Sequence, residues 1–110
     1  MNPTHAQIPL ACDMNVFPPA ERELHIQTTN KLFQAVRNIR EADNGYEFSF
    51  PGSSVTIVQV AEFISRERLC CPFLEFRFNV LPDYEVSTLL LTGPEGTQEF
   101  LRAEFSEVFG

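Results

Sequence analysis

The segment from Leu74 to Val80 constrains the fold of this chain more strongly than any other. Its apolar residues, Leu74, Phe76, Phe78 and Val80, alternate with Glu75, Arg77 and Asn79. Successive side chains of a β-strand point to opposite faces, so this pattern predicts a strand with one apolar face. A short connection at 81–84 leads to residues 86–92, whose apolar run predicts a second, more fully buried strand.

A second pair of strands is predicted on either side of Asp43-Asn44-Gly45. After this turn, Tyr46, Phe48 and Phe50 alternate with Glu47 and Ser49, and Pro51-Gly52 ends the strand. Asn-Gly favours a tight hairpin because both residues accept positive φ angles. Residues 36–41 fit the first strand of the hairpin, although their apolar spacing could also continue the preceding helix through Ile39.

Three helices are predicted from apolar residues at helical spacing. The first runs over 19–35, and the second begins at a cap, Ser53 or Ser54, and ends before Pro72. The expected core face of the second helix is Ile57, Val60, Ala61 and Ile64. The third helix follows Gly93-Pro94-Glu95, where Thr92 and Glu95 resemble a capping box.

The predicted order of elements is α-β-β-α-β-β-α. This order favours an α+β two-layer sandwich, in which a four-stranded antiparallel sheet carries helices on one face. Residues 1–17 lack periodicity and are predicted to run as an extended N-terminal arm, whereas 18–110 form a single domain. The two edge strands of such an open sheet allow a homodimer, and the pattern leaves the strand order open.

The composition excludes several classes of function. The chain carries 15 acidic and 8 basic side chains, and its net charge of -7 argues against a nucleic-acid partner. No apolar run reaches the roughly 20 residues that span a bilayer, so we expect no membrane attachment. Three cysteines are too few for a secreted disulfide scaffold. We therefore expect a cytoplasmic protein with reduced thiols.

The adjacent pair Cys70-Cys71 is the first candidate for chemistry. Each cysteine taken alone fits a small buried apolar side chain equally well. Neighbouring helical side chains point about 100° apart, so one thiol could face the core while the other faces a cavity. The helix C-terminus and Glu67 should raise a thiol pKa, which argues against an activated nucleophile unless Arg66 or Arg68 lies close.

Two further residues could join this pair. Cys12 lies in the arm, where Ile8, Leu10, Val16 and Phe17 could anchor it near the cysteines. His25 shares a helical face with Leu32, where a lone histidine is most often a half-buried hydrogen-bonding group. If these residues meet, the sequence predicts a metal site formed by Cys12, His25, Cys70 and Cys71. Its thiol and imidazole donors suit zinc or another thiophilic metal, and the same thiols could instead act as a redox-sensitive patch.

The spacing of these residues is not that of a zinc finger, because no C-x-x-C or H-x-x-x-H is present. Adjacent cysteines chelate a small tetrahedral ion less comfortably than spaced ones, so larger mercury-like or arsenic-like ions stay open. The motifs of serine hydrolases, phosphate-binding loops, dinucleotide-binding folds and zinc proteases are also missing. A thiol enzyme therefore ranks lowest among the functions considered.

The alternative function is a ligand-binding or oligomerisation domain whose cysteines are structural. Most of the eleven phenylalanines fall at expected core positions. The residues left over as candidates for a pocket rim or a dimer contact are Phe17, Phe63, Phe73 and Phe109. A phenylalanine-lined pocket between sheet and helices would then bind a small apolar ligand.

The run from Glu67 to Phe76, ERLCCPFLEF, resembles a group of small bacterial proteins marked by E-R-x-C-C-P/S-F-x-x-F. The likeness extends over most of the chain from Pro9, and Cys-Cys-Pro-Phe is its most specific part. Members of that group can accompany MerR-type or heavy-metal-related regulators, and the group has no established activity. The resemblance therefore implies a suspected site at Cys12, His25, Cys70 and Cys71, and no reaction.

Overall fold

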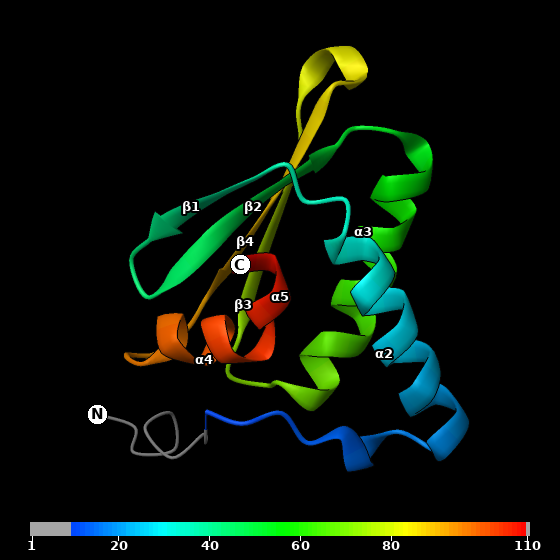
Figure 1. Ribbon diagram of the computed structural model, residues 1–110, viewed down its shortest axis with the longest axis vertical. Helices are drawn as coiled ribbons and strands as arrows, with labels where there is room; N and C mark the ends of the chain where they lie inside the picture. The colour runs from blue at the N-terminus through cyan, green and yellow to red at the C-terminus, as the bar shows by residue number, and fades with distance from the viewer. Residues whose placement is uncertain (1–9, 110) are drawn as a thin grey trace.

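The structure is a computed structural model that describes residues 10–109 (Figure 1). Its helices and strands are, in chain order, η1 (Met14–Val16), α2 (Pro19–Phe33), β1 (Asn38–Ala42), β2 (Gly45–Pro51), α3 (Ser54–Cys70), β3 (Glu75–Val80), η2 (Pro82–Tyr84), β4 (Val86–Thr92), α4 (Thr97–Glu104) and α5 (Ser106–Phe109). Apart from the short 3-10 turns and the division of the last helix into α4 and α5, this order is the predicted one. Within residues 10–109, no helix is both long and apolar enough to cross a membrane.

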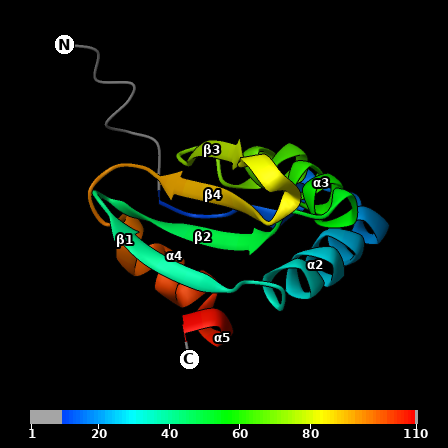
Figure 2. The same cartoon turned by 90° about the horizontal axis from the view of Figure 1, so that it is seen from above.

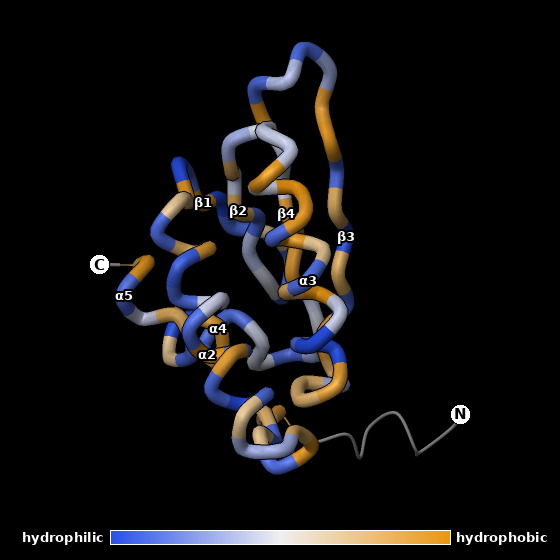
Figure 3. Tube along the Cα trace, turned by 90° about the vertical axis from the view of Figure 1, so that its right-hand side faces the viewer, coloured by the Kyte–Doolittle hydropathy of each residue, from blue (hydrophilic) through white to orange (hydrophobic). Residues whose placement is uncertain are grey.

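The four strands form one antiparallel sheet in the order β1-β2-β4-β3, which Figure 2 shows from above. Pairing places Ile39, Phe48, Leu89 and Phe78 in one row across the sheet. The apolar residues of β3 alternate with polar ones as predicted (Figure 3). The predicted α+β two-layer sandwich is confirmed.

All four helices pack on the face of the sheet that carries this apolar row. Phe33 of α2 contacts Phe48 of β2, with ring centroids 5.3 Å apart. Phe63 of α3 contacts Phe76 of β3, and Phe109 of α5 contacts Tyr46 of β2. The opposite face carries Arg40, Glu47, Leu90 and Arg77 in the neighbouring row. The core therefore lies in a single layer between sheet and helices.

The sequence left open whether residues 36–41 continue the first helix or form a strand, and the structure shows a strand. α2 ends at Phe33, two residues before the predicted end, and Asn38–Ala42 pairs with β2 as a strand. Ser53 caps α3, since its hydroxyl oxygen accepts a hydrogen bond from the Thr56 amide at 3.2 Å. The helix stops at Cys70, before Pro72 as expected.

The predicted core face of α3 was wrong by about one position. Its buried residues are Thr56, Val60, Phe63, Glu67 and Cys70. Of the four residues expected to face the core, Val60 is buried, Ile57 and Ile64 are half-buried, and Ala61 is exposed. The rotation arises because Phe63 fills the space beside the sheet and Glu67 has a buried partner on α2.

The start of α4 also differs from the expected capping box. The N-cap is Gly96, which has a left-handed φ of 98° and makes no side-chain capping bond. Thr92 instead pairs with both Gly45 and Glu75 as the last residue of β4. A residue held in the sheet ladder ends too early to cap a helix that begins at Thr97.

Gly45 serves close approach of two strands rather than a positive φ angle. The loop residues are Asp43 and Asn44, of which Asn44 has a φ of 55°, and Gly45 already pairs with Ala42 as the first residue of β2. A Cβ atom built at Gly45 would overlap the carbonyl oxygen of Leu91 on β4. The expectation of two positive-φ positions at Asn44-Gly45 was therefore wrong, although the hairpin forms where predicted.

The described part of the arm is tied to the ends of two helices. The Asp13 amide donates to the Cys70 carbonyl oxygen at 2.8 Å, which joins the arm to the end of α3. The Arg22 guanidinium donates to the carbonyl oxygens of Met14 at 3.1 Å and Phe17 at 3.2 Å. Phe17 is buried as expected, whereas Leu10 and Val16 are exposed, and Ile8 lies outside the described residues.

Substituting Gly45 by alanine should destabilise the fold because the new methyl group meets backbone that cannot rotate away. We expect a loss of about 2 to 3 kcal/mol in the free energy of unfolding, typical of overpacking. Urea denaturation followed by circular dichroism measures this loss. Asp43→Ala, at an exposed position of the same turn, is the matched control, and an equal loss in both variants would contradict the argument.

Candidate thiol and metal site

The end of α3 places two cysteines inside the protein. Cys70 is the last helical residue and Cys71 is its cap, with the Cys71 amide donating to the Glu67 carbonyl oxygen at 2.8 Å. Both side chains are 0% exposed. The expectation that one thiol faces the core and the other a cavity is therefore not met, because the turn before Pro72 folds both sulfurs inward.

The arm completes this group through a disulfide between Cys12 and Cys71. The two residues are 59 positions apart in the chain, and their Cα atoms lie 4.4 Å apart. Cys70 is free and buried, with its sulfur 3.9 Å from that of Cys71. The arm thus brings Cys12 to the cysteine pair as the sequence suggested, but as a disulfide, whereas we expected reduced thiols.

Glu67 is the site residue that the sequence analysis missed. One carboxylate oxygen, Oε1, lies 2.8 Å from His25 Nε2 and 3.6 Å from the Cys70 sulfur. The other, Oε2, lies 3.4 Å from the Cys71 sulfur. The sequence does contain a sign of its role, because Glu67 precedes Cys70 by three positions and Cys71 by four. At this spacing the carboxylate and both cysteines lie on adjoining parts of one helix face.

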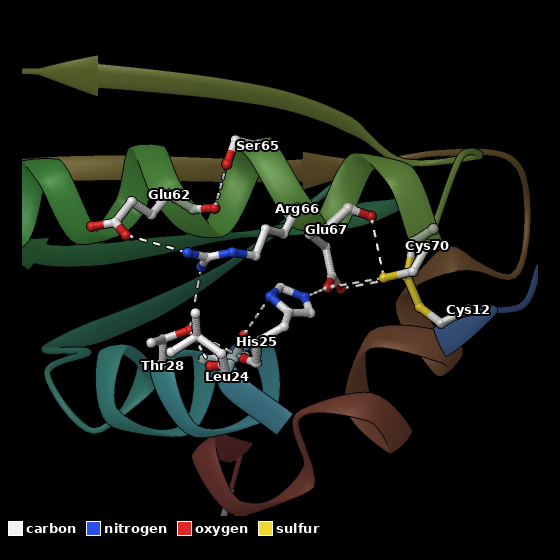
Figure 4. Close-up of polar contacts among 11 residues, drawn as sticks. Cys12, Leu24, His25, Thr28, Glu62, Ser65, Arg66, Glu67 and Cys70 are labelled. Atoms are coloured by element: carbon white, nitrogen blue, oxygen red, sulfur yellow. Dashed lines mark hydrogen bonds and ion pairs between the residues drawn. A yellow bond between two sulfur atoms is a disulfide. The ribbon is translucent and has the colours of Figure 1, made fainter. Parts of the chain in front are cut away.

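His25 is buried beside this group without touching the cysteines. Its ring lies 5.4 Å from that of Phe17 and 6.1 Å from that of Phe63, measured between centroids. Its Nε2 donates to Glu67, and its Nδ1 lies 3.5 Å from the Thr29 hydroxyl oxygen. His25 therefore reaches the predicted site through Glu67 rather than as a fourth member of it (Figure 4).

The compact set of possible metal-ligating atoms differs from the predicted set by one residue. It consists of Cys12, Glu67, Cys70 and Cys71, with one ligand atom from each all lying within 4.8 Å of one another. Glu67 takes the place expected for His25 because the histidine comes from α2, on the far side of the carboxylate. Three sulfurs and a carboxylate are ligands for a thiophilic cation.

The surroundings keep the Cys70 sulfur protonated. Burial, the nearby Glu67 charge and a hydrogen bond to Glu67 raise the pKa of the Cys70 thiol from 9.0 to about 12. Partial burial and Glu67 also raise the pKa of the Glu104 carboxyl, against an opposing contribution from His25. Arg66 does not offset these effects, because its guanidinium lies 3.3 Å from the Glu62 carboxylate (Figure 4). The expected rise in a thiol pKa is confirmed for Cys70.

The phenylalanines do not form the expected pocket rim. Phe17, Phe63 and Phe73 are buried in the core, and Phe109 is partly buried against it. A groove of about 610 Å³ does lie between the end of α2, β1 and the α4–α5 segment. Its lining includes Phe33, Phe105 and Thr29, so it approaches His25 through Thr29 and remains separate from the cysteines.

The disulfide should stabilise the protein chiefly by restricting the unfolded chain. For two residues 59 positions apart, loop closure corresponds to up to about 4 kcal/mol. We expect Cys12→Ser to lose up to this amount relative to the oxidised protein in urea denaturation. In excess reductant the variant and the parent protein should differ little, and equal stability without reductant would contradict a formed disulfide.

The raised pKa of Cys70 predicts a specific loss of stability at high pH. Between pH 9 and about 12 the unfolded chain gives up the Cys70 proton while the folded chain keeps it, so the free energy of unfolding falls as the pH rises. Below pH 9 this contribution is fully present. Cys70→Ala removes it, so the variant should show a shallower decline in urea denaturation over this range. Identical slopes would contradict the assignment.

Comparisons of the chain with protein-family models, with curated proteins and with solved structures find no match in any of the three. The resemblance to the E-R-x-C-C-P-F-x-x-F group is not tested by them and stays a prediction. The functional interpretation of this site therefore rests on the geometry of its residues.

Proposed function

We propose that this protein binds a soft, thiophilic metal ion through Cys12, Cys70 and Cys71 when the cysteines are reduced, and loses that capacity when the Cys12–Cys71 disulfide forms. One observation carries the proposal. Three cysteine sulfurs from two distant parts of the chain and the Glu67 carboxylate lie within 4.8 Å of one another.

The spacing of the sulfurs fits a common metal geometry. Zinc binds thiolates at about 2.3 Å, so two sulfurs at tetrahedral angles lie about 3.8 Å apart. The Cys70 and Cys71 sulfurs are 3.9 Å apart, and Glu67 Oε2 is 3.4 Å from Cys71. The adjacent cysteines thus suit a small tetrahedral ion better than their sequence spacing suggested. Mercury and trivalent arsenic accept fewer ligands and would use the three sulfurs.

His25 would orient the Glu67 ligand without binding the metal itself. Residues that hydrogen-bond a metal ligand orient it and commonly alter metal affinity. His25 Nε2 holds Glu67 Oε1 at 2.8 Å, which leaves Oε2 directed at the cysteine sulfurs. We therefore assign His25 a positioning role rather than the ligand role that the sequence suggested.

The disulfide makes this site responsive to redox state. Reduction by a dithiol breaks the Cys12–Cys71 bond, delivers two electrons and two protons, and yields two thiols while the dithiol becomes a disulfide. Only then would three sulfurs be available to a metal. A reducing compartment such as the cytoplasm would favour the binding form. The proposed partner is thus a metal ion, and the homodimer stays a prediction.

Metal titration of the reduced protein tests this proposal. The protein is reduced with a phosphine, which lacks a competing thiol, and is titrated without oxygen with Zn²⁺, Hg²⁺ or arsenite against a chromophoric chelator. We expect about one equivalent of a thiophilic ion per chain and none bound to the oxidised form. His25→Gln should weaken binding by about 10- to 100-fold.

Glu62→Gln is the matched control, because Glu62 lies on the same helix at an exposed position. Its metal affinity should equal that of the parent protein. If the reduced protein binds none of the three ions better than a variant with serine at all three cysteines, the proposal is wrong. The cysteines would then be structural, and the groove beside α2 would become the leading ligand site.

A further inference from the structure

We infer that the Cys12–Cys71 disulfide is an exchange site for external dithiols, which attack the Cys12 sulfur while Cys71 acts as the leaving group. The inference rests on the reversible disulfide of the proposed function and adds a partner class and a direction. The partner is a small molecule or peptide that carries two neighbouring thiols.

Access distinguishes the two sulfurs of the bond. Cys12 lies in the arm and is partly exposed, whereas Cys71 is 0% exposed beneath it. In thiol–disulfide exchange the outcome depends on which sulfur an incoming thiolate can reach. The attacking sulfur approaches along the bond axis from the side opposite the leaving sulfur. That approach to Cys71 would start inside the core, so attack is confined to Cys12.

A hydrogen-bond acceptor already lies beside Cys71, the proposed leaving group. Glu67 Oε2 lies 3.4 Å from the Cys71 sulfur, and the carboxylate is held in turn by His25. Figure 4 shows Glu67 and His25 on one side of the cysteine sulfurs and Cys12 on the other. Once it is protonated, the released Cys71 thiol has Glu67 Oε2 beside it as a hydrogen-bond acceptor, as the Cys70 thiol has Oε1.

The exchange proceeds in two balanced steps. A thiol of the dithiol gives its proton to water, and the resulting thiolate forms a bond to the Cys12 sulfur. The Cys12–Cys71 bond breaks, its electron pair goes to Cys71, and Cys71 takes up a proton from water. The second thiolate of the dithiol then attacks the mixed disulfide and releases Cys12. The protein disulfide is reduced by two electrons, and the dithiol is oxidised to its own disulfide.

Cys70 does not divert this sequence. Its sulfur is 3.9 Å from that of Cys71, yet it donates to the Glu67 carbonyl oxygen at 3.5 Å and contacts Oε1 at 3.6 Å. These contacts hold the buried Cys70 thiol against Glu67 on α3. Cys12 therefore remains the partner of Cys71 through repeated cycles.

The arm keeps the two sulfurs together after the bond breaks. The backbone hydrogen bond from the Asp13 amide to the Cys70 carbonyl oxygen adjoins Cys12 and involves neither sulfur of the disulfide. Arg22 fixes the next stretch of the arm through Met14 and Phe17. These contacts hold Cys12 at the end of α3, ready either to form the metal site or to close the disulfide again.

Mapping of the mixed disulfide tests the direction of exchange. The oxidised, folded protein is exposed to glutathione, a monothiol that stops after the first step, quenched in acid, digested and analysed by mass spectrometry. We expect the adduct on Cys12 with Cys71 free. In the dithiol-reduced folded protein, Cys12 should react with iodoacetamide at least about tenfold faster than Cys71.

A glutathione adduct on Cys71, or adducts that form only in urea, would overturn the inference. Glu62→Gln, at an exposed position of α3, is the matched control, since it leaves the disulfide intact and should give the same adduct on Cys12. Metal binding is read separately, by titration of the phosphine-reduced protein. Exchange at Cys12 without metal uptake would refute only the proposed function, and metal uptake with an adduct on Cys71 would refute only this inference.

Discussion

The buried contact between Glu67 and His25 is the interaction on which the rest of the site depends. The two side chains are among the few buried polar groups, at 3% and 2% exposed, and they meet at 2.8 Å. A carboxylate taken out of water without a partner would cost several kcal/mol. The pair therefore requires α2 and α3 to lie side by side in one register. It also fixes the rotation of α3 that turns Cys70 and Cys71 inward.

The arm converts this helix end into a multi-ligand site. A backbone bond from Asp13 to the last residue of α3 and side-chain bonds from Arg22 of α2 bring Cys12 to the same place. Two of the three sulfurs are then within bonding reach of each other, and the third lies close by. The same backbone arrangement can consequently hold the site in two chemical states. In one the Cys12–Cys71 disulfide is formed, and in the other the reduced sulfurs are free to bind a ligand.

The sequence predicted the fold well because its strongest patterns are local. The alternation along β3 and the turn at Asn44 depend on residues within a few positions of one another. The rotation of α3 was not predictable in the same way, since a charged residue such as Glu67 is assigned to solvent until its partner is known. That partner lies 42 positions away on another helix. The pairing of Cys12 with Cys71 depends on the same long-range arrangement, so the approach of Cys12 to the cysteine pair was predicted but the disulfide was not.

The disulfide also divides the chain topologically. The covalent loop from Cys12 to Cys71 encloses α2, β1, β2 and α3, while β3, β4 and the last helices lie outside it. Tension applied at the two ends of the oxidised chain would pass through the disulfide, bypass this loop and load the segment after Cys71, from β3 to α5. About 200 Å of contour length would stay locked, given 59 positions at about 3.4 Å each. In the oxidised protein, the residues between Cys12 and Cys71 therefore cannot be extended by force on the two ends. Reduction of the disulfide allows the whole chain to extend.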